Sequence, residues 1–122
     1  DVKNQGLTNH VVMDEDLTIH RNVMPHLDLI SSGTAVESPS EVVDSHRLST
    51  VFEYIRDEYD VIVVDTPSVL SVTDALVIAE KGDGVLFVVK GHYVQPDDMA
   101  LAKQRLDQIG VPIIGSVFID ME

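Results

Sequence analysis

The stretch DVIVVDTPSVLSVTDALVIAEKGDGVLFVVK, Asp60 to Lys90, decides the fold class of this chain. It begins with VIVV, a continuous β-branched run that is typical of a strand buried on both faces in a parallel sheet. Asp74 to Lys81 then predicts a short helix, capped by Thr73 and closed by Gly82. A second apolar run, Gly84 to Lys90, predicts another buried strand and completes a strand–helix–strand unit.

A long helix is predicted upstream of this unit, from Ser38 to Tyr59. Ser38 and Glu41 have the spacing of a capping box, and Pro39 occupies the first helical position. An apolar stripe at helical spacing follows, formed by Leu48, Val51, Phe52, Ile55 and Tyr59. The stripe predicts that one face of this helix packs against a core.

Shorter elements are expected towards both ends of the chain. Gly6 to Met13 suits a short helix, and the alternating pattern of His26 to Gly33 predicts a short strand. A further helix from Pro96 to Gly110 precedes a last strand, Ile113 to Asp120. This alternation predicts an α/β fold with a mostly parallel sheet and helices on its faces, formed as a single domain by residues 1–122.

The overall composition excludes several classes of function. The chain has 122 residues, of which 44% are hydrophobic, and a net charge of −13. Such an acidic surface disfavours binding to nucleic acid or to anionic lipid. There is no cysteine, and no apolar run is long enough to span a bilayer. Because the first residue is Asp1 rather than Met, we expect the chain to be a portion of a longer polypeptide.

Asp65 is the main candidate for a functional residue. It follows the predicted strand VIVV directly and precedes Thr66 and Pro67. In parallel α/β sheets, ligands bind beyond the carboxyl ends of the strands, which is where Asp65 would lie. The residues alone leave two interpretations open: the carboxylate caps a turn, or it holds Mg²⁺ at a nucleotide site.

The region Tyr59 to Lys90 resembles the Walker B region of the MinD/ParA-like P-loop ATPases, and most closely that of the bacterial tyrosine kinases (BY-kinases). Asp65-Thr66-Pro67 matches the start of the DTPP motif of this family, and Val72 to Ala75 matches V-x-D-A. Three other family motifs are matched in the same order along the chain, by Gly6–Thr8, Ser38–Val42 and Val111–Asp120.

This resemblance implies a function for the intact protein. Asp65 would bind Mg²⁺ on ATP, Thr66 and Pro67 would shape the turn, and Asp74 would cap its helix or support the site indirectly. The enzyme would transfer the γ-phosphoryl group of ATP to tyrosines of neighbouring subunits in a ring-like homo-oligomer. It would lie at the cytoplasmic face of the inner membrane, work with a membrane polysaccharide co-polymerase segment, and regulate capsule or exopolysaccharide export. Ser68 and Asp120 depart from the Pro and Asn of the family pattern.

The phosphate-binding half of such a site is missing from the sequence. A phosphate loop needs closely spaced glycines followed by Lys, because backbone N–H groups must approach the phosphates and a cation must neutralise them. None of the seven glycines is followed by Lys. We therefore expect this chain to be the C-terminal portion of a BY-kinase domain, inactive alone and without a catalytic residue of its own.

Three alternatives remain open. The chain could be a degenerate MinD/ParA-like ATPase without catalysis, or a non-catalytic interaction module. It could also resemble a response-regulator receiver, in which Asp16 would be the acidic group after the first strand, Asp65 the Asp that ends the third strand, and Lys90 the Lys that ends the fifth. Asp65 and Lys90 are too close in sequence to hold the intervening strand and helix of a receiver comfortably.

Overall fold

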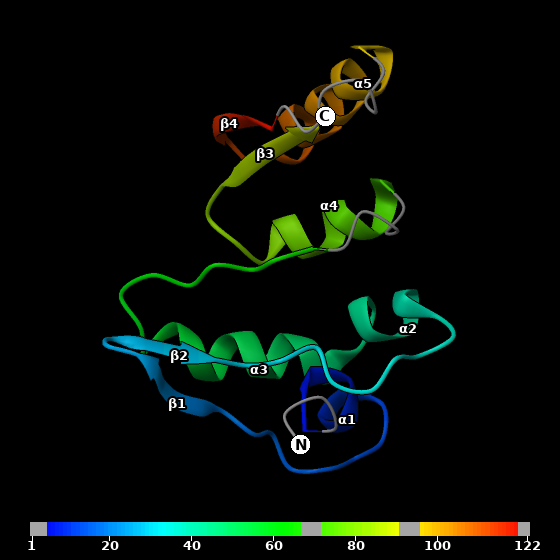
Figure 1. Cartoon of the computed structure of the whole chain (residues 1–122). Helices are drawn as coiled ribbons and strands as arrows, with labels where there is room; N and C mark the ends of the chain where they lie inside the picture. Colours follow the sequence, from blue (N-terminus) through cyan, green and yellow to red (C-terminus); the bar gives the residue numbers. More distant parts are fainter. Residues whose placement is uncertain (1–4, 67–71, 91–95, 120–122) are drawn as a thin grey trace. The chain divides into compact units, whose positions relative to one another are not determined.

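The computed structural model describes residues 5–66, 72–90 and 96–119 (Figure 1). The chain divides into two compact units, unit 1 (Asp1–Val63) and unit 2 (Val64–Glu122). Both units mix helices with strands, and unit 2 contains a parallel strand pair, so the α/β fold class is confirmed. The prediction that residues 1–122 form a single domain stays a prediction.

Unit 1 combines an antiparallel hairpin with three helices. Strands β1 (His20–Met24) and β2 (Leu27–Leu29) pair with each other, and a register irregularity lies between His20 and Met24. The helices are α1 (Leu7–Val11), α2 (Pro39–Val43) and α3 (His46–Arg56). Helix α1 and strand β2 confirm the two short elements expected from the sequence, whereas β1 was not predicted.

The predicted helix from Ser38 to Tyr59 is wrong in its continuity, because the chain breaks between α2 and α3. Ser45 has extended backbone angles there, and its side chain accepts a hydrogen bond from the Arg47 backbone N–H at 3.1 Å. Ser competes with a helix through such local bonds, which is why it ends one helix and caps the next. The Ser38 capping box is also wrong, since Ser38 makes no side-chain cap bond, although Pro39 does begin α2.

The core of unit 1 lies on the apolar stripe of α3. Leu48, Val51 and Ile55 are buried, as the helical spacing predicted. Leu48 clusters with Val11 and Val42 of the other two helices, and Leu7, Val36 and Phe52 pack around this cluster. Tyr59 lies beyond the end of α3 rather than on its stripe, and it makes polar contacts instead.

Asn9 fastens the beginning of α1 to the segment after β2. This buried side chain accepts hydrogen bonds from the backbone N–H groups of Gly6 and Thr34, both at 3.1 Å. Its amide also donates to the Thr34 hydroxyl at 3.0 Å. The backbones run close together here, with Leu7 N–H bonded to the Ser31 carbonyl at 2.8 Å. A buried amide whose oxygen and nitrogen both have partners fixes one arrangement of these two segments.

Unit 2 contains the parallel strands β3 (Val85–Lys90) and β4 (Ile113–Ile119), with α5 (Pro96–Ile109) between them in the sequence, and α4 (Val72–Glu80) before them. The strands pair from Val85 with Ile113 to Lys90 with Ile119. Gly110 ends α5 with a left-handed φ of 75°, as its position predicted. Helix α4 begins at Val72, one residue before the predicted cap Thr73.

Two predictions of burial are wrong. Val61–Val64 forms no strand and is exposed, with 77% of Val61 and 87% of Val63 accessible to solvent. Strand β3 alternates between half-buried and exposed residues rather than being buried on both faces. A strand is covered on both faces only when neighbouring strands and helices supply the cover. Among the described residues no strand pairs with Val61–Val64, and β3 pairs only with β4.

Candidate functional site

Asp65 lies at the end of the exposed Val61–Val64 run, and both Asp65 and Thr66 are exposed. Pro67 lies outside the described residues. Asp74 is half-buried and belongs to the first turn of α4, where the helix dipole stabilises a carboxylate. The structure therefore places Asp65 where a ligand can reach it, and it gives Asp74 a place that suits a helix start.

A single exposed carboxylate fits part of a magnesium site. Mg²⁺ keeps several waters and takes one or two protein carboxylates together with phosphate oxygens of its substrate. Within residues 5–66, 72–90 and 96–119, no three His, Asp or Glu side chains gather closely enough to hold a metal ion by themselves.

A second polar site lies in unit 1, where the hairpin meets the end of α3. Asp28 on β2 accepts hydrogen bonds from the Tyr59 hydroxyl at 2.6 Å and from Arg21 on β1 at 3.1 Å. Arg21 also donates to the Tyr59 oxygen at 2.9 Å, and Asn22 N–H donates to Asp28 at 2.9 Å. Asn22 has a left-handed φ of 50°, in the irregular part of the hairpin. We call Arg21, Asp28 and Tyr59 the hairpin triad.

The hydrogen bonds within the hairpin triad shift the pKa values of its members. The pKa of Asp28 is lowered, first by the hydrogen bond from Tyr59 and then by the backbone N–H of Asn22 and by Arg21. The pKa of Tyr59 is raised, chiefly because its hydroxyl donates to Asp28. Both shifts favour one state, in which an ionised Asp28 faces a protonated Tyr59.

These shifts predict how unit 1 depends on pH. The pKa of Asp28 is lower in the folded state than its ordinary value of 3.8. Ionised Asp28 therefore stabilises unit 1 at pH values above 3.8, and this stabilisation is lost as the pH falls through the pKa of the folded state. The pKa of Tyr59 is raised in the folded state above its ordinary value of 10.0. Protonated Tyr59 therefore stabilises unit 1 at pH values below 10.0, and this stabilisation is lost as the pH rises through the pKa of the folded state. We expect Asp28→Asn to lower the urea midpoint of unfolding at pH 7. The difference between this midpoint and that of the unaltered chain should disappear at acid pH, where Asp28 is protonated.

Urea unfolding followed by circular dichroism at several pH values would measure this. Asp44→Asn is a suitable control, because Asp44 is an exposed carboxylate of unit 1, after the end of α2, that has no part in the hairpin triad. A midpoint difference for Asp28→Asn that stays constant from neutral to acid pH would contradict the assignment.

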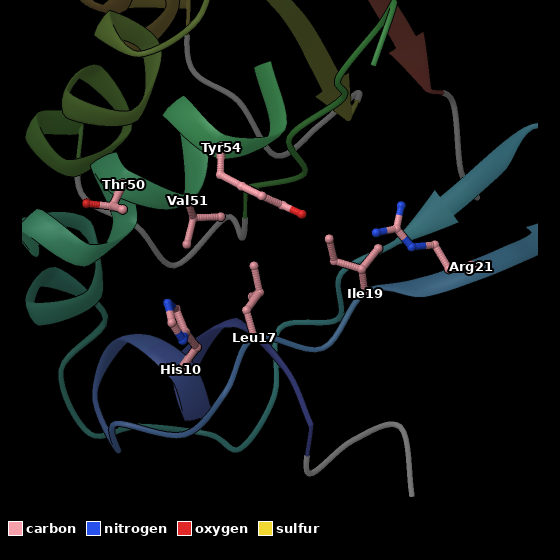
Figure 2. Close-up of a pocket in the computed structure, with 7 residues that line it drawn as sticks. All are labelled: His10, Leu17, Ile19, Arg21, Thr50, Val51 and Tyr54. Atoms are coloured by element: carbon pink, nitrogen blue, oxygen red, sulfur yellow. The ribbon is translucent and has the colours of Figure 1, made fainter. Parts of the chain in front are cut away.

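A hollow of about 410 Å³ opens beside the hairpin triad (Figure 2). It is lined by His10, Leu17, Ile19, Arg21, Thr50, Val51 and Tyr54. The ring of His10 is held by a 2.7 Å contact between its Nδ1 and the Glu15 carbonyl. Figure 2 shows the Tyr54 side chain extending across the hollow, with its hydroxyl directed towards the side on which the guanidinium of Arg21 lies.

The sequence predicts Asp65 as a site residue, which stays a prediction, and it did not indicate the hairpin triad. Asp28 and Tyr59 are 31 positions apart, and Arg21 lies on a strand that the pattern did not predict. The only local indication was the alternation of HLDLISSG, which directs Asp28 and its apolar neighbours to opposite faces. No spacing rule connects that residue with the end of a helix.

The comparison with solved structures defines the class of protein. The kinase domain of the Escherichia coli tyrosine kinase ETK matches 98% of this chain and 48% of that domain, with a TM-score of 0.81 and 29% identity. The BceF tyrosine kinase domain matches 96% of this chain and 49% of that domain, with a TM-score of 0.79 and 30% identity. The VpsO kinase domain shares the fold, with a TM-score of 0.84 at 24% identity. The fold is thus that of part of a bacterial tyrosine kinase domain.

Comparison with known protein sequences also finds bacterial tyrosine kinases, although no protein-family model matches the chain. The chain is 34% identical over 117 residues to tyrosine-protein kinase etk of Escherichia coli K12, covering 92% of this chain and 16% of etk. It is 28% identical over 115 residues to tyrosine-protein kinase CpsD of Streptococcus agalactiae, covering 93% of this chain and 50% of CpsD. Over nearly its whole length the chain is therefore related to the bacterial tyrosine kinases, and the resemblance drawn from its motifs is confirmed. It spans at most about half the length of these relatives.

Among the described residues, no helix has the length and apolar character that crossing a membrane requires.

Proposed function

We propose that this chain forms the magnesium-binding side of the nucleotide site in a bacterial tyrosine autokinase. The observation that carries the proposal is Asp65, an exposed carboxylate that follows a β-branched run, in a chain related to etk over 92% of its length. Asp65 would hold Mg²⁺ through one carboxylate oxygen or through water. The metal, when bound with ATP, neutralises charge on the transferring phosphoryl group.

The remaining parts of the site would come from elsewhere in the intact protein. A phosphate loop would orient ATP, and a tyrosine of a neighbouring subunit in a ring-like homo-oligomer would accept the γ-phosphoryl group. Positioning and charge neutralisation supply nearly all the catalysis in phosphoryl transfer. The 122-residue chain alone is therefore expected to show no ATP turnover, because it provides one metal ligand and no phosphate loop.

The family resemblance extends the proposal to a cellular role. The intact kinase would act at the cytoplasmic face of the inner membrane, together with a membrane polysaccharide co-polymerase segment. Its autophosphorylation would regulate the length and export of capsule or exopolysaccharide chains. The strongly negative net charge of the chain agrees with protein partners rather than nucleic acid.

A second candidate function is binding without catalysis. The exposed Val61–Val64 run favours it, since an unpaired β-branched segment can add to the sheet of another polypeptide. In that case the chain would dock onto a nucleotide-bearing partner, and Asp65 would have no catalytic use.

The test is to purify the native protein from its own cells, determine its intact mass, and measure incorporation of phosphate from Mg–ATP into tyrosine. We expect a mass well above 13.4 kDa and tyrosine phosphorylation, while the 122-residue chain alone turns over no ATP. A native mass near 13.4 kDa without phosphorylation would establish the binding module instead. Magnesium-dependent turnover by the 122 residues would contradict both, and labelling of Asp65 by acetyl phosphate would favour a receiver domain.

A further inference from the structure

Tyr54 is the tyrosine that α3 presents to solvent. It is 55% exposed, whereas its helix neighbours Val51 and Ile55 are buried in unit 1. Its hydroxyl extends over the hollow rather than into the core (Figure 2). An enzyme that modifies a tyrosine must reach the phenol oxygen, and the structure gives Tyr54 that accessibility without any unfolding of α3.

Tyr59, only five residues further on, is held quite differently. Its hydroxyl donates to Asp28 at 2.6 Å and accepts from Arg21 at 2.9 Å, and the residue is half-buried. Modification of its oxygen would first require these charge-assisted hydrogen bonds to break. A phosphate on Tyr59 would also face the carboxylate of Asp28. The two tyrosines are therefore a natural pair for comparison, since one is open and the other is bonded.

Arg21 is suited to receive a phosphate on Tyr54. Arg21 and Tyr54 line the same hollow, and the side chain of Arg21 is 58% exposed. Its hydrogen bonds to Asp28 and Tyr59 both come from one nitrogen, Nη1, of a group that carries five N–H donors. The pKa of Arg21 is raised, chiefly by its hydrogen bond to Asp28, and Tyr54 is among the lesser contributors. A phosphate dianion offers the planar guanidinium a bidentate partner.

We propose that Tyr54 is a phosphorylation site, and that Arg21 binds the resulting phosphate across the hollow. The donor is a nucleoside triphosphate: the bond between its γ-phosphorus and the β,γ-bridging oxygen breaks, a bond forms from the Tyr54 oxygen to phosphorus, and the phenol proton leaves to a base or to water. The proposal rests on the proposed function only in taking the intact kinase as the source of this activity.

Such a phosphate would act on the hairpin triad. It carries a charge of about −1.5 to −2 at neutral pH, more than the single charge of the Asp28 carboxylate with which it would compete for Arg21. Arg21 would then be shared between α3 and the hairpin, so that the state of Tyr54 alters how firmly β1 and β2 are fastened to Tyr59. Phosphorylation of Tyr54 would thereby weaken the hydrogen bonds that hold the hairpin to Tyr59.

The first experiment uses the 122-residue chain, Mg–ATP and the active kinase domain of Escherichia coli ETK as donor enzyme. Trypsin cleaves after Arg47, Arg56 and Lys81, which leaves Tyr54 and Tyr59 in separate peptides for mass spectrometry. We expect phosphate on Tyr54 at a level at least about tenfold above Tyr59, because the Tyr59 hydroxyl must give up its hydrogen bonds first. Tyr54→Phe should abolish most of the labelling, and the matched variant Tyr59→Phe should retain it. Absence of phosphate on Tyr54, or equal labelling of both tyrosines, would overturn the assignment.

A second measurement tests the role of Arg21. In the phosphorylated chain, ³¹P NMR reports the second pKa of the phosphate, which is about 6 without a partner. We expect it to be lower by at least about 0.5 units than in phosphorylated Arg21→Gln, because a nearby cation favours the dianion. Arg21→Lys, which keeps the charge, should keep most of the shift. Equal values in all three proteins would refute binding by Arg21. Since ETK supplies the activity, these outcomes are independent of whether the native protein is itself a kinase.

Discussion

Gly6→Ala is expected to destabilise unit 1 by about 3 kcal/mol or more, as overpacking against rigid backbone does at the upper end of its range. A Cβ at Gly6 would collide with the backbone N and Cα of Gly33 and would come within 2.6 Å of the Ser31 carbonyl oxygen. Backbone atoms cannot rotate away as a side chain does, so the two segments must separate. Separation would also break the hydrogen bonds of Asn9 and Leu7 that join them.

Small domains have total stabilities of about 5–15 kcal/mol, so this loss would remove much of the stability of unit 1. The measurement is the urea midpoint followed by circular dichroism. Gly82→Ala is the matched control, because its nearest contact would be the Ala79 carbonyl at an ordinary 3.7 Å, and it should change stability by less than about 0.5 kcal/mol. Similar midpoints for both variants would show that the two segments are not packed as described.

Asp65→Asn is expected to lower the tyrosine kinase activity of the intact native protein about 100-fold or more. Loss of a residue that merely supports a metal ligand already costs about 10–100-fold, and Asp65 is proposed to be the ligand. Asn keeps the size of the side chain and removes its charge, so the change should appear as a higher magnesium requirement together with a lower rate. Unit stability should be unaffected, because Asp65 is exposed.

Asp60→Asn provides the control for this substitution. Asp60 is also exposed and flanks the same Val61–Val64 run at its other end, where no nucleotide is expected. Its activity should stay within about twofold of the unaltered protein, since exposed surface substitutions are usually mild. If Asp65→Asn retained the activity and magnesium dependence of Asp60→Asn, Asp65 would not be the metal ligand.

The sequence predicted best those elements whose limits are set locally. Helix α5 begins at Pro96 and ends before Gly110 as expected, because both residues act on their own backbone. The division of α2 from α3 was missed, since the capping bond of Ser45 competes with an apolar stripe that continues on both sides of it. The capping preference of Ser45 predicts a break in the helix, whereas the apolar stripe predicts that the helix continues, and the two effects are of comparable strength.

Features that depend on distant partners could not be predicted in the same way. The burial of Val61–Val64 depends on which strands lie beside it, and its composition only shows that it is suited to such neighbours. The hairpin triad joins Arg21 to residues 7 and 38 positions away. At the candidate site, the sequence predicts Asp65 as a metal ligand at the end of an apolar run, and this stays a prediction. The accessibility of Tyr54 beside Arg21 depends on the three-dimensional fold of unit 1 and has no local signal in the sequence.

Val61 to Val64 also affects how this chain behaves at high concentration. An uncovered β-branched run is the kind of segment from which intermolecular cross-β aggregation begins. Asp60 and Asp65 stand at its two ends as gatekeepers, because stacking identical chains in register would bring their carboxylates together. The net charge of −13 adds a repulsion that salt screens beyond about 8 Å at physiological ionic strength. Dilute salt and ionised carboxylates therefore keep copies of this chain apart, and acid or concentrated salt removes that protection.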